Sequence, residues 1–181
     1  RLDCFFGDPL PTLPTVVREL GGRPLLCTLR TQGEGGQARL SPEEYEQRLT
    51  ALLEKGGFGL VDIELACGEE RVSRLVSLAK RQGIGVVISK HDFAKTPPSE
   101  EIAATLRKMK ALGADLPKYA VMPHTPEDVL ALLSATRQAS REIGPVITMS
   151  MGELGKLTRA CGGVFGCCLT FGAGQSASAP G

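Results

Sequence analysis

A lysine within an apolar segment is the residue best suited to covalent chemistry in this sequence. Lys118 stands in residues 115–122, DLPKYAVM, and residues 117–122 are predicted to form a buried strand. Burial disfavours the charged form of a lysine and lowers its pKa, so a neutral amine becomes available to attack a ketone. The simpler alternative is a buried aliphatic stem whose ammonium group reaches water. Spacing alone favours that alternative.

A histidine is the natural partner for such an amine. His91 follows an apolar run over residues 84–89 that is typical of a fully buried strand. An imidazole titrates near neutral pH and therefore suits proton transfer. Taken alone, a loop histidine bonded to the backbone is the simpler interpretation. The other histidine, His124, follows Pro123 and is expected in a surface loop.

Three polar residues could hold an anionic, hydroxylated substrate: Arg30, Arg159 and Ser178. A guanidinium group can donate two parallel hydrogen bonds to a carboxylate. For each of them alone, an ordinary salt bridge or a helix cap is the simpler role. Glu34, between glycines, could orient the histidine or stabilise its charged form, or it could be a solvated loop carboxylate.

Two further carboxylates, Asp62 and Glu64, alternate within a predicted strand and therefore point to the same side of it. We expect them to stabilise the structure or to hold site residues in place without contacting substrate themselves.

These residues must be positioned by alternating strands and helices. Strands are predicted over residues 25–29, 60–65, 84–89, 117–122, 145–149 and 168–171, with helices over 41–53, 72–79, 99–112, 125–142 and 153–160. Such alternation favours a parallel sheet with right-handed crossovers. An open doubly wound sheet and a closed barrel both fit this order.

Two observations favour the barrel. No Gly-x-Gly-x-x-Gly or Walker pattern follows a predicted strand, which weakens the nucleotide-binding version of the open sheet. Polar residues come near the ends of several strands, as at the carboxyl face of a (β/α)8 barrel. Such a barrel typically takes ~250 residues, and this chain has 181. We therefore expect a single α/β barrel domain over residues 1–181, lacking the first strand or strands and the last helix.

Composition excludes several classes of partner. The 21 Lys and Arg residues nearly balance the 20 Asp and Glu residues and are scattered, which argues against nucleic acid or an anionic membrane surface. No apolar run approaches the roughly 18–20 residues of a membrane helix. The six cysteines form no Cys-x-x-Cys pair for a metal, and Cys27 and Cys168 fall in predicted buried strands. Free thiols in a reducing compartment are expected.

An ordered set of segments resembles the type I 3-dehydroquinate dehydratases. The Arg-x-x-x-Glu-Gly-Gly pattern of that family is similar to residues 30–36. The other matching segments are residues 87–93 with 96–97, 113–118, 147–152, 159, 165–166, 169–172 and 178–181. Each segment is a modest signal, but the ordered set covers nearly the whole chain and is highly specific.

The resemblance implies a role for each site residue. Lys118 corresponds to the lysine that forms an imine with the substrate, His91 to the general acid and base, and Glu34 to the residue that supports His91. Arg30 would contact substrate hydroxyls. Arg159 and Ser178 would bind the substrate carboxylate.

At the first residues the chain resembles the end of the family's Glu-x-Arg-x-Asp strand, so Arg1 would bind substrate. The sequence departs from the family at its ends, where the Glu before Arg1 and the Gln after Gly181 are absent. Lys90 also replaces a residue that is more often small and polar. The missing parts bear on barrel closure and on activity.

By this resemblance the chain would remove water from 3-dehydroquinate to give 3-dehydroshikimate, a step of the shikimate pathway to aromatic amino acids. The resemblance implies a cytoplasmic homodimer that needs no metal or cofactor and binds neither nucleic acid nor membrane. Two alternatives stay open. One is a class I Schiff-base aldolase, and the other is an inactive, truncated barrel.

Overall fold

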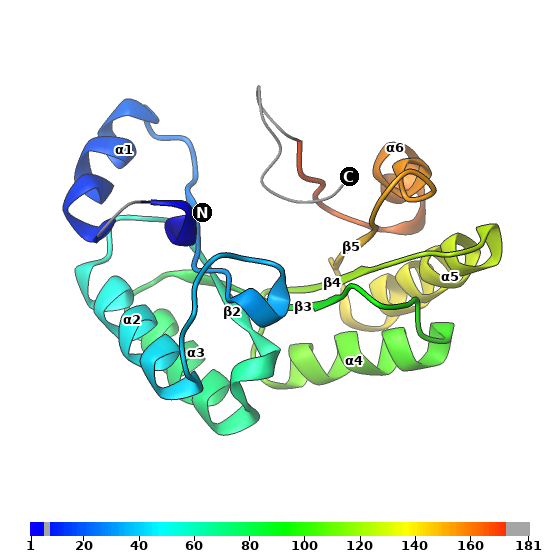
Figure 1. The fold of residues 1–181 in the computed structure, drawn as a ribbon, viewed down its shortest axis with the longest axis horizontal. Helices are drawn as coiled ribbons and strands as arrows, with labels where there is room; N and C mark the ends of the chain where they lie inside the picture. The colour runs from blue at the N-terminus through cyan, green and yellow to red at the C-terminus, as the bar shows by residue number, and fades with distance from the viewer. Residues whose placement is uncertain (6–7, 173–181) are drawn as a thin grey trace. The chain divides into compact units, whose positions relative to one another are not determined.

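The computed structural model describes residues 1–5 and 8–172 of the chain (Figure 1). Its five strands are β1 (Leu26–Thr28), β2 (Leu60–Glu64), β3 (Gly85–Asp92), β4 (Leu116–Val121) and β5 (Ile147–Ser150). They form one sheet in the order of the chain, and the β1–β2 and β4–β5 pairs are parallel. The fold is therefore α/β, as predicted, with the strand order of a (β/α)8 barrel in an open sheet.

Helices follow the strands as the sequence pattern indicated. The α-helices are α1 (Leu13–Glu19), α2 (Pro42–Lys55), α3 (Glu69–Arg81), α4 (Ser99–Ala111), α5 (Pro126–Ile143) and α6 (Lys156–Phe165). Short 3₁₀ helices lie at η1 (Leu2–Cys4), η2 (Leu10–Thr12), η3 (Gln32–Glu34) and η4 (Leu65–Cys67). Within the described residues, no helix is both long and apolar enough to span a membrane.

The described chain divides into two compact units, of which the first comprises Arg1–Ile88 and Leu112–Asp115. In this unit α2 and α3 pack side by side (Figure 1). The apolar residues of α2 recur at helical spacing, so one face of the helix is buried, including Tyr45, Leu49 and Leu53. Ser41 caps this helix: its hydroxyl accepts from Glu44 N, and the Glu44 carboxylate accepts from Ser41 N at 2.7 Å.

The second unit comprises Ser89–Ala111 and Leu116–Gly181. Here α4 and α5 lie side by side (Figure 1). The buried Thr136 hydroxyl of α5 lies 2.7 Å from the Thr148 hydroxyl of β5. This bond shows which face of β5 the helix covers. Because side chains alternate along a strand, the residue after Thr148, Met149, points to the opposite face.

The predicted strand over residues 168–171 is wrong. Residues 168–172 form no strand. An isolated bridge joins Cys167 to Val146, the residue before β5, and Cys168 N donates to Val146 O at 2.9 Å. Cys168 is exposed rather than buried. A four-residue apolar run does not by itself distinguish a strand from an extended loop. The prediction for Cys27 holds, because it is buried in β1.

The last helix was also misplaced, because α6 covers Lys156–Phe165 instead of residues 153–160. A tight turn precedes the helix. This turn requires glycine at position 155, because a Cβ there would lie 2.1 Å from Ser150 O. The helix then continues through Gly162, where the missing side chain allows Cys167 to approach. It ends at Gly166, whose φ of 101° is left-handed.

The first residues likewise differ from the expected tail of a strand. Leu2–Cys4 form a 3₁₀ helix. Local hydrogen bonds of the turn, such as Cys4 N to Arg1 O, replace strand pairing there.

The Ser41 cap yields a stability prediction. We expect Ser41→Ala to lower the free energy of unfolding by ~1 kcal/mol, because the backbone N–H of Glu44 loses its capping partner. Urea titration followed by circular dichroism measures the change. The matched control is Ser77→Ala, at an exposed site within α3, which should leave stability unchanged or slightly higher. Equal midpoints for the two variants would contradict the capping role.

Candidate active site

Lys118 is the third residue of β4, and only 6% of it is exposed. It is paired in register with Ile147 of β5, and Ala120 with Met149. Its ammonium nitrogen lies 4.7 Å from the centroid of the Phe171 ring, within the range of a cation–π contact. The side chain is therefore held within the protein, and the alternative of an ammonium group reaching water is not what the structure shows.

His91 lies within β3, as its seventh residue, and not in a loop after the strand as predicted. Its ring stacks near that of Phe93, with centroids 6.1 Å apart. The neighbouring Lys90 places its ammonium nitrogen 5.0 Å from the centre of the Tyr119 ring, so these two side chains share one face of the sheet. Alternation then puts His91 and Lys118 together on the other face. Tyr119 lies in register with Thr148, so the face of His91 and Lys118 is the one that α5 does not cover.

Arg159 joins this group from α6. Its Nη1 atom lies 3.4 Å from Phe171 O and 3.7 Å from Met149 Sδ. Its Nε atom is buried and makes no hydrogen bond within residues 1–5 and 8–172. Phe171 therefore contacts both Lys118, through its ring, and Arg159, through its carbonyl oxygen. Sequence reasoning assigned Phe171 no role, although it lies in one of the family-like segments.

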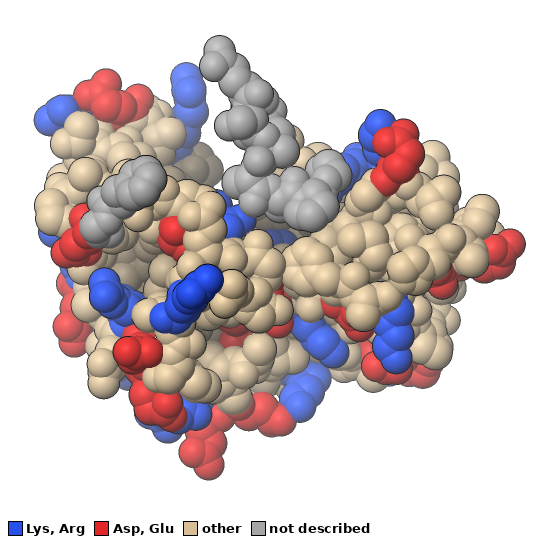
Figure 2. All heavy atoms as spheres, in the orientation of Figure 1, with Lys and Arg blue, Asp and Glu red and all other residues tan. Residues whose placement is uncertain are grey.

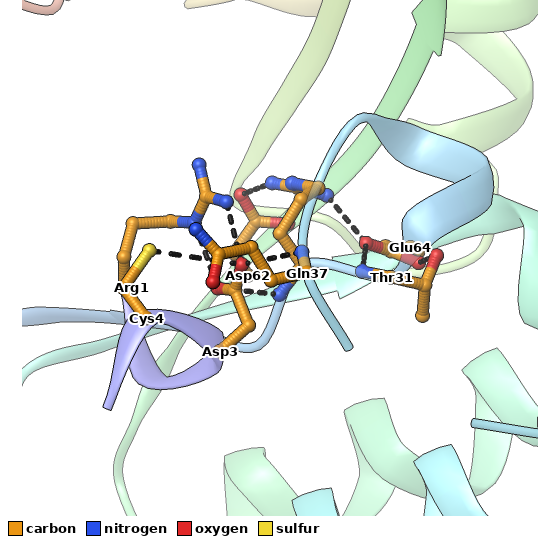
Figure 3. A network of polar contacts seen from close by, with 8 residues as sticks. Arg1, Asp3, Cys4, Thr31, Gln37, Asp62 and Glu64 are labelled. Atoms are coloured by element: carbon orange, nitrogen blue, oxygen red, sulfur yellow. Dashed lines mark hydrogen bonds and ion pairs between the residues drawn. The ribbon is translucent and has the colours of Figure 1, made fainter. Parts of the chain in front are cut away.

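The second group of polar residues belongs to the first unit and is organised around Arg30 (Figure 3). Arg30 is buried, and its Nη2 and Nη1 atoms donate to Asp62 at 2.5 Å and to Glu64 at 3.0 Å. Burial opposes the charge of Arg30, but the two carboxylates outweigh it and hold the pKa of Arg30 above its ordinary value. Asp62 and Glu64 do point to the same side of β2, as predicted.

Asp3 holds Arg1 through one edge of the guanidinium group (Figure 3): Nε donates to Oδ1 at 2.8 Å and Nη2 to Oδ2 at 2.6 Å. The same carboxylate accepts from the backbone nitrogens of Arg30 and Gln37, at 3.2 and 3.0 Å. Burial favours the neutral acid, but these bonds win and lower the pKa of Asp3 to about 2. Arg1 thus lies beside the segment that carries Arg30.

Glu34 ends the short helix η3 and is 7% exposed, so it is not a solvated loop carboxylate. Its backbone is shaped by the glycines that follow. Gly35 is left-handed, with a φ of 80°, and a Cβ at Gly36 would lie 2.1 Å from Arg30 O. Only glycine fits the second position without displacing the Arg30 backbone.

The structure thus brings the predicted residues together in two sets. His91, Lys118 and Arg159 form one, and Arg1, Arg30 and Glu34 form the other. Ser178 lies outside the described residues. His124 is exposed in a loop, as predicted, with its ring nitrogen Nε2 2.6 Å from Ala94 O.

In the described part of the chain, no group of three or more His, Cys, Asp or Glu side chains is arranged to hold a metal ion. On the face drawn in Figure 2, acidic and basic side chains are interspersed, with no extended region of one sign.

Comparison with known proteins gives a consistent result. Residues 1–181 match the sequence model of the type I 3-dehydroquinase family. The 3-dehydroquinate dehydratase of Enterococcus faecalis is 46% identical over all of this chain and 74% of its own length. That of Neisseria gonorrhoeae strain FA 1090 is 46% identical over 99% of this chain and 72% of its own length.

Solved structures agree. The 3-dehydroquinate dehydratase of Geobacillus kaustophilus superposes with a TM-score of 0.91 at 41% identity, over 96% of this chain and 68% of that one. The type I enzyme of Clostridium difficile, solved with covalently modified comenic acid, gives a TM-score of 0.86 at 43% identity, over 95% of this chain and 70% of that one. Sequence and fold therefore agree, and the chain belongs to the type I 3-dehydroquinases, which are hydro-lyases that act on 3-dehydroquinate.

Proposed function

We propose that this chain dehydrates 3-dehydroquinate through an imine on Lys118, with His91 moving the protons. The observation that carries the proposal is the buried Lys118 on the same sheet face as His91. The Clostridium difficile relative with covalently modified comenic acid is in keeping with covalent capture of a ligand in this family.

The reaction is an elimination from a β-hydroxy ketone, and its difficulty is the carbanion formed next to the carbonyl group. An amine that adds to the ketone loses water through a carbinolamine and gives a protonated imine. This cationic C=N group accepts electrons better than C=O does. The neutral amine is the form that attacks, and burial of the kind seen at Lys118 favours it. Hydrolysis of the product imine regenerates the lysine.

His91 would take the proton next to the imine carbon and leave an enamine. The same imidazole, now charged, would protonate the departing hydroxyl group, which leaves as water. The product is 3-dehydroshikimate, and the reaction is balanced because the proton removed is returned with the leaving group. Glu34 would support the charged form of His91.

The arginines would bind the rest of the substrate. Arg159, with its buried Nε donor, would bind the substrate carboxylate, together with Ser178. Arg30 and Arg1 would contact the hydroxyl groups. Their carboxylate partners hold the guanidinium groups in defined orientations, which reduces the entropy lost on binding.

We also propose that the chain acts as a homodimer in the cytoplasm, within the shikimate pathway. The family resemblance supports the dimer, and the six cysteines, all free thiols in the structure, suit a reducing compartment. Light scattering coupled to size-exclusion chromatography tests the dimer. A mass of twice 19.2 kDa is expected, and a mass of 19.2 kDa at micromolar concentration would exclude it.

The first prediction concerns the imine. After incubation with 3-dehydroquinate and borohydride, intact-mass spectrometry should show one adduct, which peptide mapping places on Lys118. Lys118→Ala should give no adduct and at least ~10³-fold lower kcat, because the nucleophile is lost. Lys110→Ala, on α4, is the matched lysine control and should keep the adduct.

The outcomes separate the alternatives. Substantial turnover by Lys118→Ala would exclude the assignment of the lysine. An adduct with cleavage of a carbon–carbon bond among the products would indicate an aldolase. Folded wild-type chain that gives neither adduct nor turnover would favour an inactive barrel.

The second prediction concerns His91. His91→Ala should still form the imine but turn over ~10²–10⁴-fold more slowly, the usual contribution of a general acid and base. Borohydride capture should therefore yield at least as much adduct as in wild type, because the imine accumulates. If His91→Ala formed no imine, the histidine would act in the earlier steps instead.

A further inference from the structure

Glu64 has more contacts than a simple ion-pair partner needs. It is 2% exposed, at the end of β2. Its Oε1 atom accepts from Arg30 Nη1 at 3.0 Å and from Thr31 N at 2.9 Å, and its Oε2 atom accepts from the Thr31 hydroxyl at 2.6 Å (Figure 3). The Glu64 backbone N–H donates to the Tyr45 hydroxyl at 2.9 Å, which fixes the strand end itself.

Thr31 is the residue from which the Glu34 segment is built. It is the N-cap of η3, and its carbonyl oxygen accepts from Glu34 N at 3.1 Å and from Gly36 N at 2.8 Å. The position of the Thr31 peptide therefore sets the position of the Glu34 backbone. Both donors of Thr31, the N–H and the hydroxyl, are directed to the Glu64 carboxylate.

We propose that Glu64 is a positioning residue that couples the substrate-binding arginine Arg30 to the loop that carries Glu34. This rests on the function proposed above, because Arg30 and Glu34 matter only if they act on substrate and on His91. Glu64 Oε1 accepts from the Arg30 guanidinium group, and both Oε1 and Oε2 accept from Thr31, at the start of the Glu34 loop. Movement of either is thereby transmitted to the other.

The neighbouring carboxylate provides an internal comparison. Asp62 binds the other arm of the same guanidinium group, Nη2, at 2.5 Å. Both carboxylates are buried and both compensate the charge of Arg30, so both matter for its orientation. Because the donors of Thr31 are used by Glu64, the two residues should differ in their effect on the Glu34 loop.

The experiment measures kcat and KM separately for Glu64→Gln and Asp62→Asn. Each amide keeps the size of the acid but removes its charge and turns one acceptor into a donor. We expect Asp62→Asn to raise KM about tenfold and to change kcat less than about threefold, because the bonds between Glu64 and Thr31 stay in place. Glu64→Gln should raise KM by a similar factor and also lower kcat about tenfold or more, because Glu34 is displaced as well.

Thr31→Val keeps the backbone bond to Glu64 and the shape of the side chain but removes the hydroxyl. It should lower kcat about three- to tenfold with KM nearly unchanged. Glu46→Gln is the matched control, since it removes one carboxylate from an ion pair with Arg74 between α2 and α3. It should leave both constants as in wild type.

Several outcomes would overturn the proposal. Among them are a Glu64→Gln variant with wild-type kcat, or Asp62→Asn and Glu64→Gln with the same pattern of change. If Glu64→Gln does not fold, as judged by circular dichroism, Thr31→Val decides alone, and an unchanged kcat there rejects the coupling. Borohydride capture on the wild type shows whether only the coupling through Glu64 fails or the proposed function fails as well. An adduct on Lys118 with no effect at Glu64 rejects only the coupling, whereas no wild-type adduct rejects the mechanism beneath it.

Discussion

The structure depends on how two buried cationic side chains are held, Lys118 within β4 and Arg30 just after the end of β1. A buried cation is stable only when its lost hydration is replaced. For Arg30 the replacement is electrostatic, with Asp62 and Glu64 on the adjacent strand in direct contact with the two arms of the guanidinium group. Lys118 is almost fully buried, and its ammonium nitrogen lies 4.7 Å from the centroid of the Phe171 ring. The acids keep Arg30 charged. At Lys118 burial favours the neutral amine, whereas the Phe171 ring favours the charged form.

This difference follows from the chemistry required of each residue. Guanidinium is the group of choice for holding hydroxyl and carboxylate oxygens, because its charge persists and its donors have fixed geometry. An amine that attacks a ketone must lose its proton first. The acids around Arg30 support the charge that its proposed task requires, and the burial of Lys118 favours the neutral amine that its proposed task requires. Arg159 lies between these cases: one donor reaches the Phe171 carbonyl oxygen, and its buried Nε makes no hydrogen bond to the described residues.

The sequence alone predicted some features of the candidate site and missed others. Lys118 stands out because a lysine in an apolar strand is rare, and the alternation of Asp62 and Glu64 predicted that they share a face. His91 was placed after its strand, but β3 runs three residues further than the apolar pattern, and these last three residues are only half-buried. Phe171 had no distinguishing signal. Its contacts with Lys118 and Arg159 arise only when an extended segment that was mistaken for a strand passes beside them.

The sequence by itself determined the class of fold, the succession of strands and helices, and the family, because hydrophobic period, capping residues and ordered motifs are local properties of the chain. It could not decide whether Glu34 was solvated or buried, whether residues 168–171 joined the sheet, or that Glu64 would hold both Arg30 and Thr31. Each of these depends on which residues, tens of positions apart, meet across the strands. Only the tertiary structure specifies such contacts, because the free energy of a buried charge is set by its neighbours in space and not by those in the chain.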